Sequence, residues 1–290
     1  MTQLFSHLRV SSEYSISQGL LTVDQIVDNA IRNSVPSVAL TDKSNMFGLV
    51  KFFNKCESAG IKPISGSSIR LIFDDDDTSY ELLCLAKTNN GHKNLMKIIS
   101  NAHNNSLYNF PIIRFNDLIE LKDDIIVISG GKDSHIFEYL KSNNISDASK
   151  RIDDFRNSFG DNFVLDVQLT NRIDEIEYLK NVLPIAKDKG IPLIATNDVL
   201  FAEQDDYEIH ETKVCINTGK TLNDPNRERV FSEHQYFKSP QEMMELFKDY
   251  DSLIDNTNEI SKKCNVSLET KGYFLPEYPV PKKHNFDSFL

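Results

Sequence analysis

Polar side chains follow three short apolar runs of this 290-residue sequence, and these side chains are the first candidates for chemistry. They belong to the segments His7-Leu8-Arg9, Thr41-Asp42-Lys43 and Thr196-Asn197-Asp198. If the apolar runs are parallel strands of a barrel, their carboxyl ends meet at one mouth, where a histidine and two carboxylates would converge on a metal ion or a phosphate. A single histidine or aspartate at a strand end more often caps a loop, so the segments alone leave both interpretations open.

Other short motifs add little. The sequence contains no Walker A motif, no Gly-x-Gly-x-x-Gly, no His-Glu-x-x-His and no Gly-x-Ser-x-Gly. Gly130-Gly131 follows an apolar run and could cradle a phosphate, but we favour a plain turn. Four consecutive aspartates, residues 74–77, are interpreted as a solvated, self-repelling turn rather than a cation site.

The segments that must position these residues alternate between amphipathic and apolar. Residues 5–10 predict a strand, and residues 22–33 predict a helix with Thr22 as its N-cap and Gln25 three residues on. A strand over 38–40, a helix ending at Gly60 and a strand over 61–64 follow. Residues 69–73 and 80–86 predict a hairpin. The alternation then resumes, with helices predicted over 94–102, 148–158 and 174–189 and strands over 125–129, 163–167 and 191–195.

About seven such β-α units in one chain predict an α/β fold in the form of a closed or nearly closed barrel. Helices are predicted over 240–247 and 252–264, and a proline-rich, extended stretch follows over 273–281. We therefore expect one barrel domain over residues 1–270. Residues 271–290 are interpreted as a linker into a further domain that this sequence lacks.

Composition limits the partners and the location. Lys and Arg total 32 and Asp and Glu total 43, so the formal net charge is −11, which disfavours an unaided grip on a phosphate backbone. No apolar run reaches 18 residues, so no membrane span is expected. The four cysteines are scattered without a Cys-x-x-Cys pair, which disfavours structural zinc and disulfides. We expect a cytoplasmic protein with no membrane partner.

An ordered set of segments resembles the PHP (polymerase and histidinol phosphatase) domain of bacterial DNA polymerase III alpha subunits. The resemblance implies a distorted (β/α)7 barrel, with a short helical and extended segment that leads to an absent palm domain. The segments that carry it are His7-Leu8-Arg9-Val10, Ala39-Leu40-Thr41-Asp42, Gly48-Leu49-Val50-Lys51-Phe52, Gly60-Ile61-Lys62-Pro63-Ile64-Ser65-Gly66, Ala195-Thr196-Asn197-Asp198, Lys262-Lys263-Cys264-Asn265-Val266 and Tyr273-Phe274-Leu275-Pro276.

The metal ligands of this family carry over poorly. Metal-binding members use a His-x-His pair, further histidines and acids, and a final Asp-x-His. Of these ligands, only His7 and Asp198 clearly remain. The other ligand positions read Arg9, Gln18, Lys43, Ser68, Glu81, Thr170 and Leu200. Because arginine stays protonated in proteins and repels a divalent ion, we expect no metal and no catalytic residue in this domain. The vestigial site would comprise His7, Asp42, Glu81 and Asp198.

The resemblance implies a domain of a DNA-directed DNA polymerase that is itself catalytically silent. It would serve as the docking surface for the proofreading exonuclease (epsilon) subunit. The parent polymerase would use Mg²⁺ in its palm domain and would also bind the sliding clamp, the clamp loader and DNA. The alternative is an active PHP phosphoesterase, acting on pyrophosphate or a DNA 3′ end.

Arg9 and Lys43 stand where metal ligands would point inward. Clustered carboxylates repel one another without a cation, and a guanidinium can contact a carboxylate at two points. We therefore predict that Arg9 or Lys43 forms an ion pair with Asp198 or Asp42, as a built-in cation in place of the metal.

Overall fold

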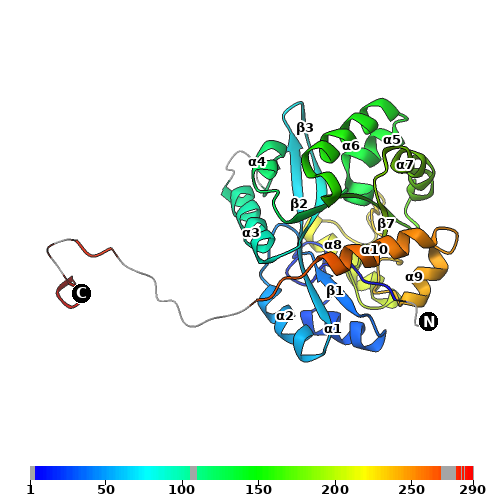
Figure 1. The fold of residues 1–290 in the computed structure, drawn as a ribbon. Helices are drawn as coiled ribbons and strands as arrows, with labels where there is room; N and C mark the ends of the chain where they lie inside the picture. The colour runs from blue at the N-terminus through cyan, green and yellow to red at the C-terminus, as the bar shows by residue number, and fades with distance from the viewer. Residues whose placement is uncertain (1–3, 105–109, 269–278, 282, 284, 290) are drawn as a thin grey trace.

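The computed structural model describes residues 4–104, 110–268, 279–281, 283 and 285–289. The strands are β1 (Ser37–Leu40), β2 (Lys62–Phe73), β3 (Asp76–Ala86), β4 (Ile113–Arg114), β5 (Ile125–Ile128), β6 (Phe163–Gln168) and β7 (Leu193–Thr196). The helices are α1 (Val23–Arg32), α2 (Leu49–Ser58), α3 (Asn89–Asn104), α4 (Phe115–Glu120), α5 (His135–Lys141), α6 (Ile145–Phe159), α7 (Glu175–Lys189), α8 (Tyr207–Thr218), α9 (Pro240–Leu246), α10 (Asp251–Lys263) and α11 (Phe286–Phe289). Figure 1 shows the helices arranged around a strongly curled sheet.

The sheet has the order β1-β2-β3-β5-β6-β7, with β4 paired to β2. Its pairs are parallel except that β3 runs antiparallel to β2 and to β5. The N-terminal segment joins the two ends of this order, because His7 bridges Val38 of β1 and Val10 bridges Val199, just beyond β7. The sheet is therefore closed into a distorted barrel, which confirms the predicted fold class.

Local sequence signals set the boundaries of the first helices. Thr22 accepts a hydrogen bond from the Gln25 backbone, and the Gln25 side chain accepts one in return from the Thr22 backbone. This capping box satisfies two of the donors that a helix start leaves unpaired. Helix α2 ends before Gly60, whose φ of 71° favours glycine over residues with a Cβ.

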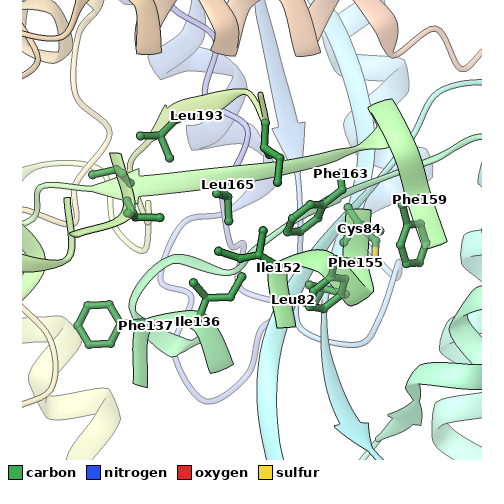
Figure 2. Close-up of a cluster of buried hydrophobic side chains, with 14 of the residues drawn as sticks. Leu82, Cys84, Ile136, Phe137, Ile152, Phe155, Phe159, Phe163, Leu165 and Leu193 are labelled. Carbon is green, nitrogen blue, oxygen red and sulfur yellow. The ribbon is translucent and has the colours of Figure 1, made fainter. Parts of the chain in front are cut away.

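Alternation along the strands separates two apolar layers. Ile126, Ile128 and Val164 belong to a cluster with Leu83 and Leu85 that fills the barrel. Their sequence neighbours Val127, Phe163 and Leu165 belong to the outer core, between the sheet and the helices. Figure 2 shows this outer layer, where the Phe155 ring of α6 stacks on the Phe163 ring of β6 with centroids 5.0 Å apart.

Several predicted elements require correction. Residues 5–10 form isolated bridges instead of a regular strand. The two strands predicted over 61–64 and 69–73 are one continuous strand, β2, which pairs parallel with β1 and then antiparallel with β3. The hairpin is confirmed, and the helices and strands predicted after it are found in the predicted order, but β4, α4, α5 and α8 were not predicted. In the aspartate turn, Asp74 and Asp75 are exposed as expected, and they pair with Arg114 and Arg151.

Most of the predicted linker over 271–290 lies outside the described residues. Among the helices that the structure describes, none is long and apolar enough to cross a bilayer.

Candidate functional site at the barrel mouth

Strand direction gathers charged side chains at one mouth of the barrel. Asp166 lies at the carboxyl end of β6, two residues after the barrel-filling Val164. Because β3 is antiparallel to its neighbours, its beginning lies at that same mouth, and Glu81 stands two residues before the barrel-filling Leu83. Side chains two residues apart on a strand share a face. Both carboxylates are therefore directed to the interior side of the mouth.

Arg9 lies between these two carboxylates. Its Nη1 is 3.9 Å from Glu81 Oε2, and its Nη2 is 3.9 Å from Asp166 Oδ2. The side chains of Arg9 and Asp166 are buried, and that of Glu81 is only 11% exposed. Burial by itself would lower the pKa of Arg9, but the carboxylates of Asp166, Asp198, Glu81 and Asp133 outweigh it and raise the pKa. Arg9 is thus a permanent cation close to four carboxylates.

Lys43 provides a second cation from the loop after β1. Its Nζ pairs with Glu81 Oε1, while Ser68 Oγ donates to Glu81 Oε2 over 3.2 Å. Burial opposes the charge of Glu81, but Lys43 and then Arg9 and Arg70 lower the pKa of this carboxyl well below its ordinary value. Glu81 is therefore a largely buried carboxylate whose charge is balanced by side chains of the same chain.

Asp166 accepts hydrogen bonds from two segments, residues 129–131 and Thr196. Ser129 Oγ donates to its Oδ1 over 2.7 Å, and the backbone N–H groups of Gly130 and Gly131 donate to the same oxygen over 3.0 and 2.7 Å. Thr196 Oγ1 donates to Oδ2 over 2.9 Å. Successive backbone N–H groups of this kind form a nest for an anion. The glycine pair that the sequence offered as a phosphate cradle or a turn therefore holds an internal carboxylate.

Asp198 belongs to a neighbouring group of polar side chains. Gln235 Nε2 donates to its Oδ2 over 2.8 Å, and Arg172 Nη1 lies 3.9 Å from that oxygen. Arg172 is held in turn by Glu175 at 3.0 Å and by a hydrogen bond to Gln168. Asp198 therefore has its own cation, supplied by the segment between β6 and α7.

His7 is used inside the fold. Its Nε2 donates to the carbonyl oxygen of Lys238 over 2.7 Å, and its ring packs between Phe5 and Phe237, with centroids at 5.0 and 4.4 Å. Burial lowers the pKa of His7 to about 4. A neutral imidazole whose Nε2 carries the proton cannot offer that nitrogen to a metal ion.

Asp42 organises the loop that precedes α1. Its Oδ1 accepts from the Ser12 backbone over 2.7 Å and from Ser15 Oγ over 2.6 Å, and its Oδ2 accepts from Ser12 Oγ over 2.7 Å. Desolvation nevertheless raises the pKa of this carboxyl above its ordinary value. Asp42 is therefore committed to the loop over residues 12–15, which forms one wall of the mouth.

The residues at the mouth do not fit the metal cluster of metal-binding PHP domains. Arg9 and Lys43 direct positive charge at the carboxylates that would act as ligands, and His7 Nε2 and the Asp42 carboxylate are engaged elsewhere. Among the residues that the structure describes, no group of three or more histidine, cysteine, aspartate or glutamate side chains is arranged to hold a metal ion.

The predicted ion pair is found with different partners. Arg9 pairs with Glu81 and Asp166, and Lys43 pairs with Glu81. Among the described residues, neither cation forms an ion pair with Asp198 or Asp42, so the predicted partners were wrong. The sequence reasoning missed Asp166, although it is the one charged residue of the apolar run over 163–167, and a charge in a buried strand requires a partner.

The sequence is similar to a known domain family and to named proteins. The PHP domain family matches residues 7–170. The DNA polymerase III subunit alpha of Pseudomonas aeruginosa is 38% identical over 292 residues, which cover 100% of this chain and 25% of that protein. The Escherichia coli K12 subunit of the same name is 38% identical over 278 residues, covering 95% of this chain and 24% of that protein.

The chain thus spans about a quarter of the length of these relatives. Among solved structures, an amidohydrolase from Chromobacterium violaceum is similar with a TM-score of 0.49 and 11% identity, covering 72% of this chain and 96% of that one.

Proposed function

The chain belongs to the PHP domain family, and on that premise we propose that it is the amino-terminal domain of a DNA polymerase III alpha subunit. In this proposal the barrel carries out no metal chemistry of its own. It serves as a scaffold on which a proofreading exonuclease subunit docks.

One observation supports the proposed lack of catalytic activity: Arg9 forms ion pairs with Glu81 and Asp166, and Lys43 forms one with Glu81. Hydrolysis of a phosphoester by metal-activated water needs a cation with an open position and ligands that are free to bind it. Here the cations belong to side chains and cannot activate a water molecule in that way. The carboxylates that would hold a metal are already balanced.

The proposed parent activity lies outside this chain. The relatives named DNA polymerase III subunit alpha are about four times its length. We propose that the whole protein joins nucleotides with Mg²⁺ held by palm carboxylates. It would work with a sliding clamp, a clamp loader and DNA in the cytoplasm. The four cysteines, all unpaired and buried, are compatible with a reducing compartment.

An active phosphoesterase is the second candidate, and one observation favours it. Glu81, Asp133, Asp166 and Asp198 all act on Arg9 electrostatically, so four carboxylates remain around the mouth. An assay of 3′→5′ hydrolysis of single-stranded DNA separates the candidates. We expect no activity from the purified chain. Hydrolysis that survives purification and disappears in Asp198→Ala would establish the enzyme instead.

Docking is tested by a binding titration at physiological salt. The 290-residue chain is titrated with the exonuclease subunit and, separately, with random duplex DNA. We expect binding of the subunit at micromolar concentration or below and no comparable binding of duplex, because a net charge of −11 opposes counterion release from DNA. Duplex binding without subunit binding would contradict the proposed partner.

A further inference from the structure

An open cleft lies at the barrel mouth beside the charge cluster, which consists of Arg9, Lys43, Glu81 and Asp166. Its volume is about 590 Å³, and its wall comes from residues 14–18, the loop after β1, and β2. Lys43 and Glu81 reach it from the charge cluster, and Arg70 of β2 and His103 of α3 lie farther along. A cleft of roughly 300–1,000 Å³ is large enough to take several side chains of a ligand.

Large apolar side chains stand exposed around this cleft. Ile16 is 78% exposed and Phe47 is 72% exposed, and both line it together with Phe110. Asn217 of α8 also lines it, and the adjacent Ile216 is 78% exposed. Single exposed apolar residues are common, but several around one concave surface mark an interaction site. Burial of these side chains would favour a partner that brings apolar groups of its own.

The charge of the cleft is opposite to the charge of the chain. Its lining contains Lys43, Arg70 and His103 but a single acid, Glu81, which is already balanced by Lys43 and Arg9. The Arg70 guanidinium lies 4.7 Å from the centre of the Phe110 ring. None of the ion pairs between described residues involves Arg70. Within a chain of net charge −11, this is a local surface that favours an anion.

We propose that this cleft binds a peptide segment of a partner protein in which a carboxylate side chain is flanked by apolar side chains. The carboxylate contacts the exposed guanidinium of Arg70, with Lys43 nearby, and the apolar side chains pack on Phe47 and Ile16. The proposal rests on the proposed docking function, and it names the surface that the exonuclease subunit uses.

Single-stranded nucleic acid would also bring anions and flat apolar rings, but the charges favour a peptide. Affinity for a phosphate backbone grows with the number of phosphates that are neutralised. The cleft offers two permanent cations, and Lys43 already balances Glu81. A peptide needs one carboxylate at this position and takes most of its affinity from apolar contacts.

The test is a titration of the 290-residue chain with the exonuclease subunit, using two variants of the cleft. Phe47→Ala removes an exposed apolar contact, and Arg70→Glu reverses the charge. Ile176→Ala on α7 and Arg156→Glu on α6 are the matched controls, because both residues are exposed and neither lines the cleft. Circular dichroism and thermal unfolding verify that all four variants fold.

We expect Phe47→Ala and Arg70→Glu each to weaken binding by about ten-fold or more, as for a central interface residue, and the controls to leave it unchanged. Replacing the acidic residues of the docking segment by amides should abolish the effect of Arg70→Glu. Binding by the wild-type chain with no loss in either cleft variant would overturn this inference and leave the proposed function standing.

Two other outcomes are equally informative. Failure of the wild-type chain to bind the subunit would overturn the proposed function together with the inference. Binding of a single-stranded oligonucleotide that is lost in both cleft variants, without such a loss for the subunit, would assign the cleft to nucleic acid and overturn the peptide assignment.

Discussion

Replacing Arg9 by methionine should destabilise the fold strongly, because it removes the cation that Glu81 and Asp166 share. Methionine keeps much of the length of the side chain, so the change isolates the charge. The side chains of Glu81 and Asp166 are 11% and 0% exposed, so water can replace little of the lost pairing at Glu81 and none of it at Asp166. Stranding a buried charge by removing its partner costs roughly 3–5 kcal/mol.

The structure places the expected loss at the lower end of this range. Asp166 keeps its four hydrogen-bond donors after the substitution, and Glu81 keeps Lys43 and Ser68. We therefore expect the free energy of unfolding to fall by about 3 kcal/mol at pH 7. Urea unfolding followed by circular dichroism measures it, because the midpoint shifts when stability changes at constant slope.

The pH dependence gives a second reading of the same variant. The pKa of Glu81 lies below its ordinary value in the folded chain, so its contribution to stability is present above the unfolded pKa and is lost as the pH falls through the folded one. Without Arg9 that folded pKa rises. Acid unfolding of Arg9→Met should therefore begin at a higher pH than in the wild type.

Two control variants decide whether the effect comes from the buried charge. Arg9→Lys retains a cation and should restore part of the lost stability. Arg32→Met breaks an ion pair with Glu203 whose partners are 62% and 59% exposed, and it should cost under about 1 kcal/mol. A loss in Arg9→Met no larger than in Arg32→Met would refute the reasoning that Arg9 balances the carboxylates.

Three further predictions concern the fold around the mouth. Gly130→Ala should cost roughly 1–3 kcal/mol or more by thermal unfolding, since φ is 99° there and a Cβ would collide with the backbone of Glu81; unchanged stability would contradict the tight approach. Thr22→Ala should cost about 0.5–2 kcal/mol in urea unfolding through loss of the capping box with Gln25, and an equal cost for the exposed Thr218→Ala would argue against capping. His7 should stay neutral in the fold until about pH 4, because burial lowers its pKa. The unfolded chain takes up that proton near pH 6.5, so the free energy of unfolding should decrease by up to about 3 kcal/mol as the pH falls from 6.5 to about 4. The decrease should be smaller in His7→Gln, and calorimetry at several pH values would detect the difference.

The sequence predicted best what local signals decide. Thr22 and Gln25 mark the start of α1, Gly60 marks the end of α2, and both are found as expected. The alternation of apolar runs and amphipathic stretches predicted the order of the strands and the barrel. These features depend on backbone geometry and on periodicity within one segment.

Features set by distant contacts were beyond the sequence. Residues 5–10 close the barrel through single bridges to β1 and to Val199, and no local pattern reveals such a closure. Helix α8 was not predicted, because its side chains do not follow one amphipathic stripe: Ile209 and Ile216 are exposed while His210 is buried.

The partners of the two cations were missed for a similar reason. Which carboxylate meets Arg9 depends on the strand order and register that place Glu81 and Asp166 on the interior side of one mouth. The residue types Arg9 and Lys43 indicated that cations stand at ligand positions. The geometry of a closed sheet was needed to identify the carboxylates that balance them.

The central claim is that side-chain cations occupy the place of a metal cluster at this barrel mouth. Elemental analysis of the purified 290-residue chain, after incubation with zinc or manganese and mild chelation, tests it most directly. We expect no stoichiometric metal, and we expect the same for a matched Asp198→Ala variant, because the wild-type carboxylates already have cations of their own. One or more ions held tightly per wild-type chain, and lost in Asp198→Ala, would contradict the account.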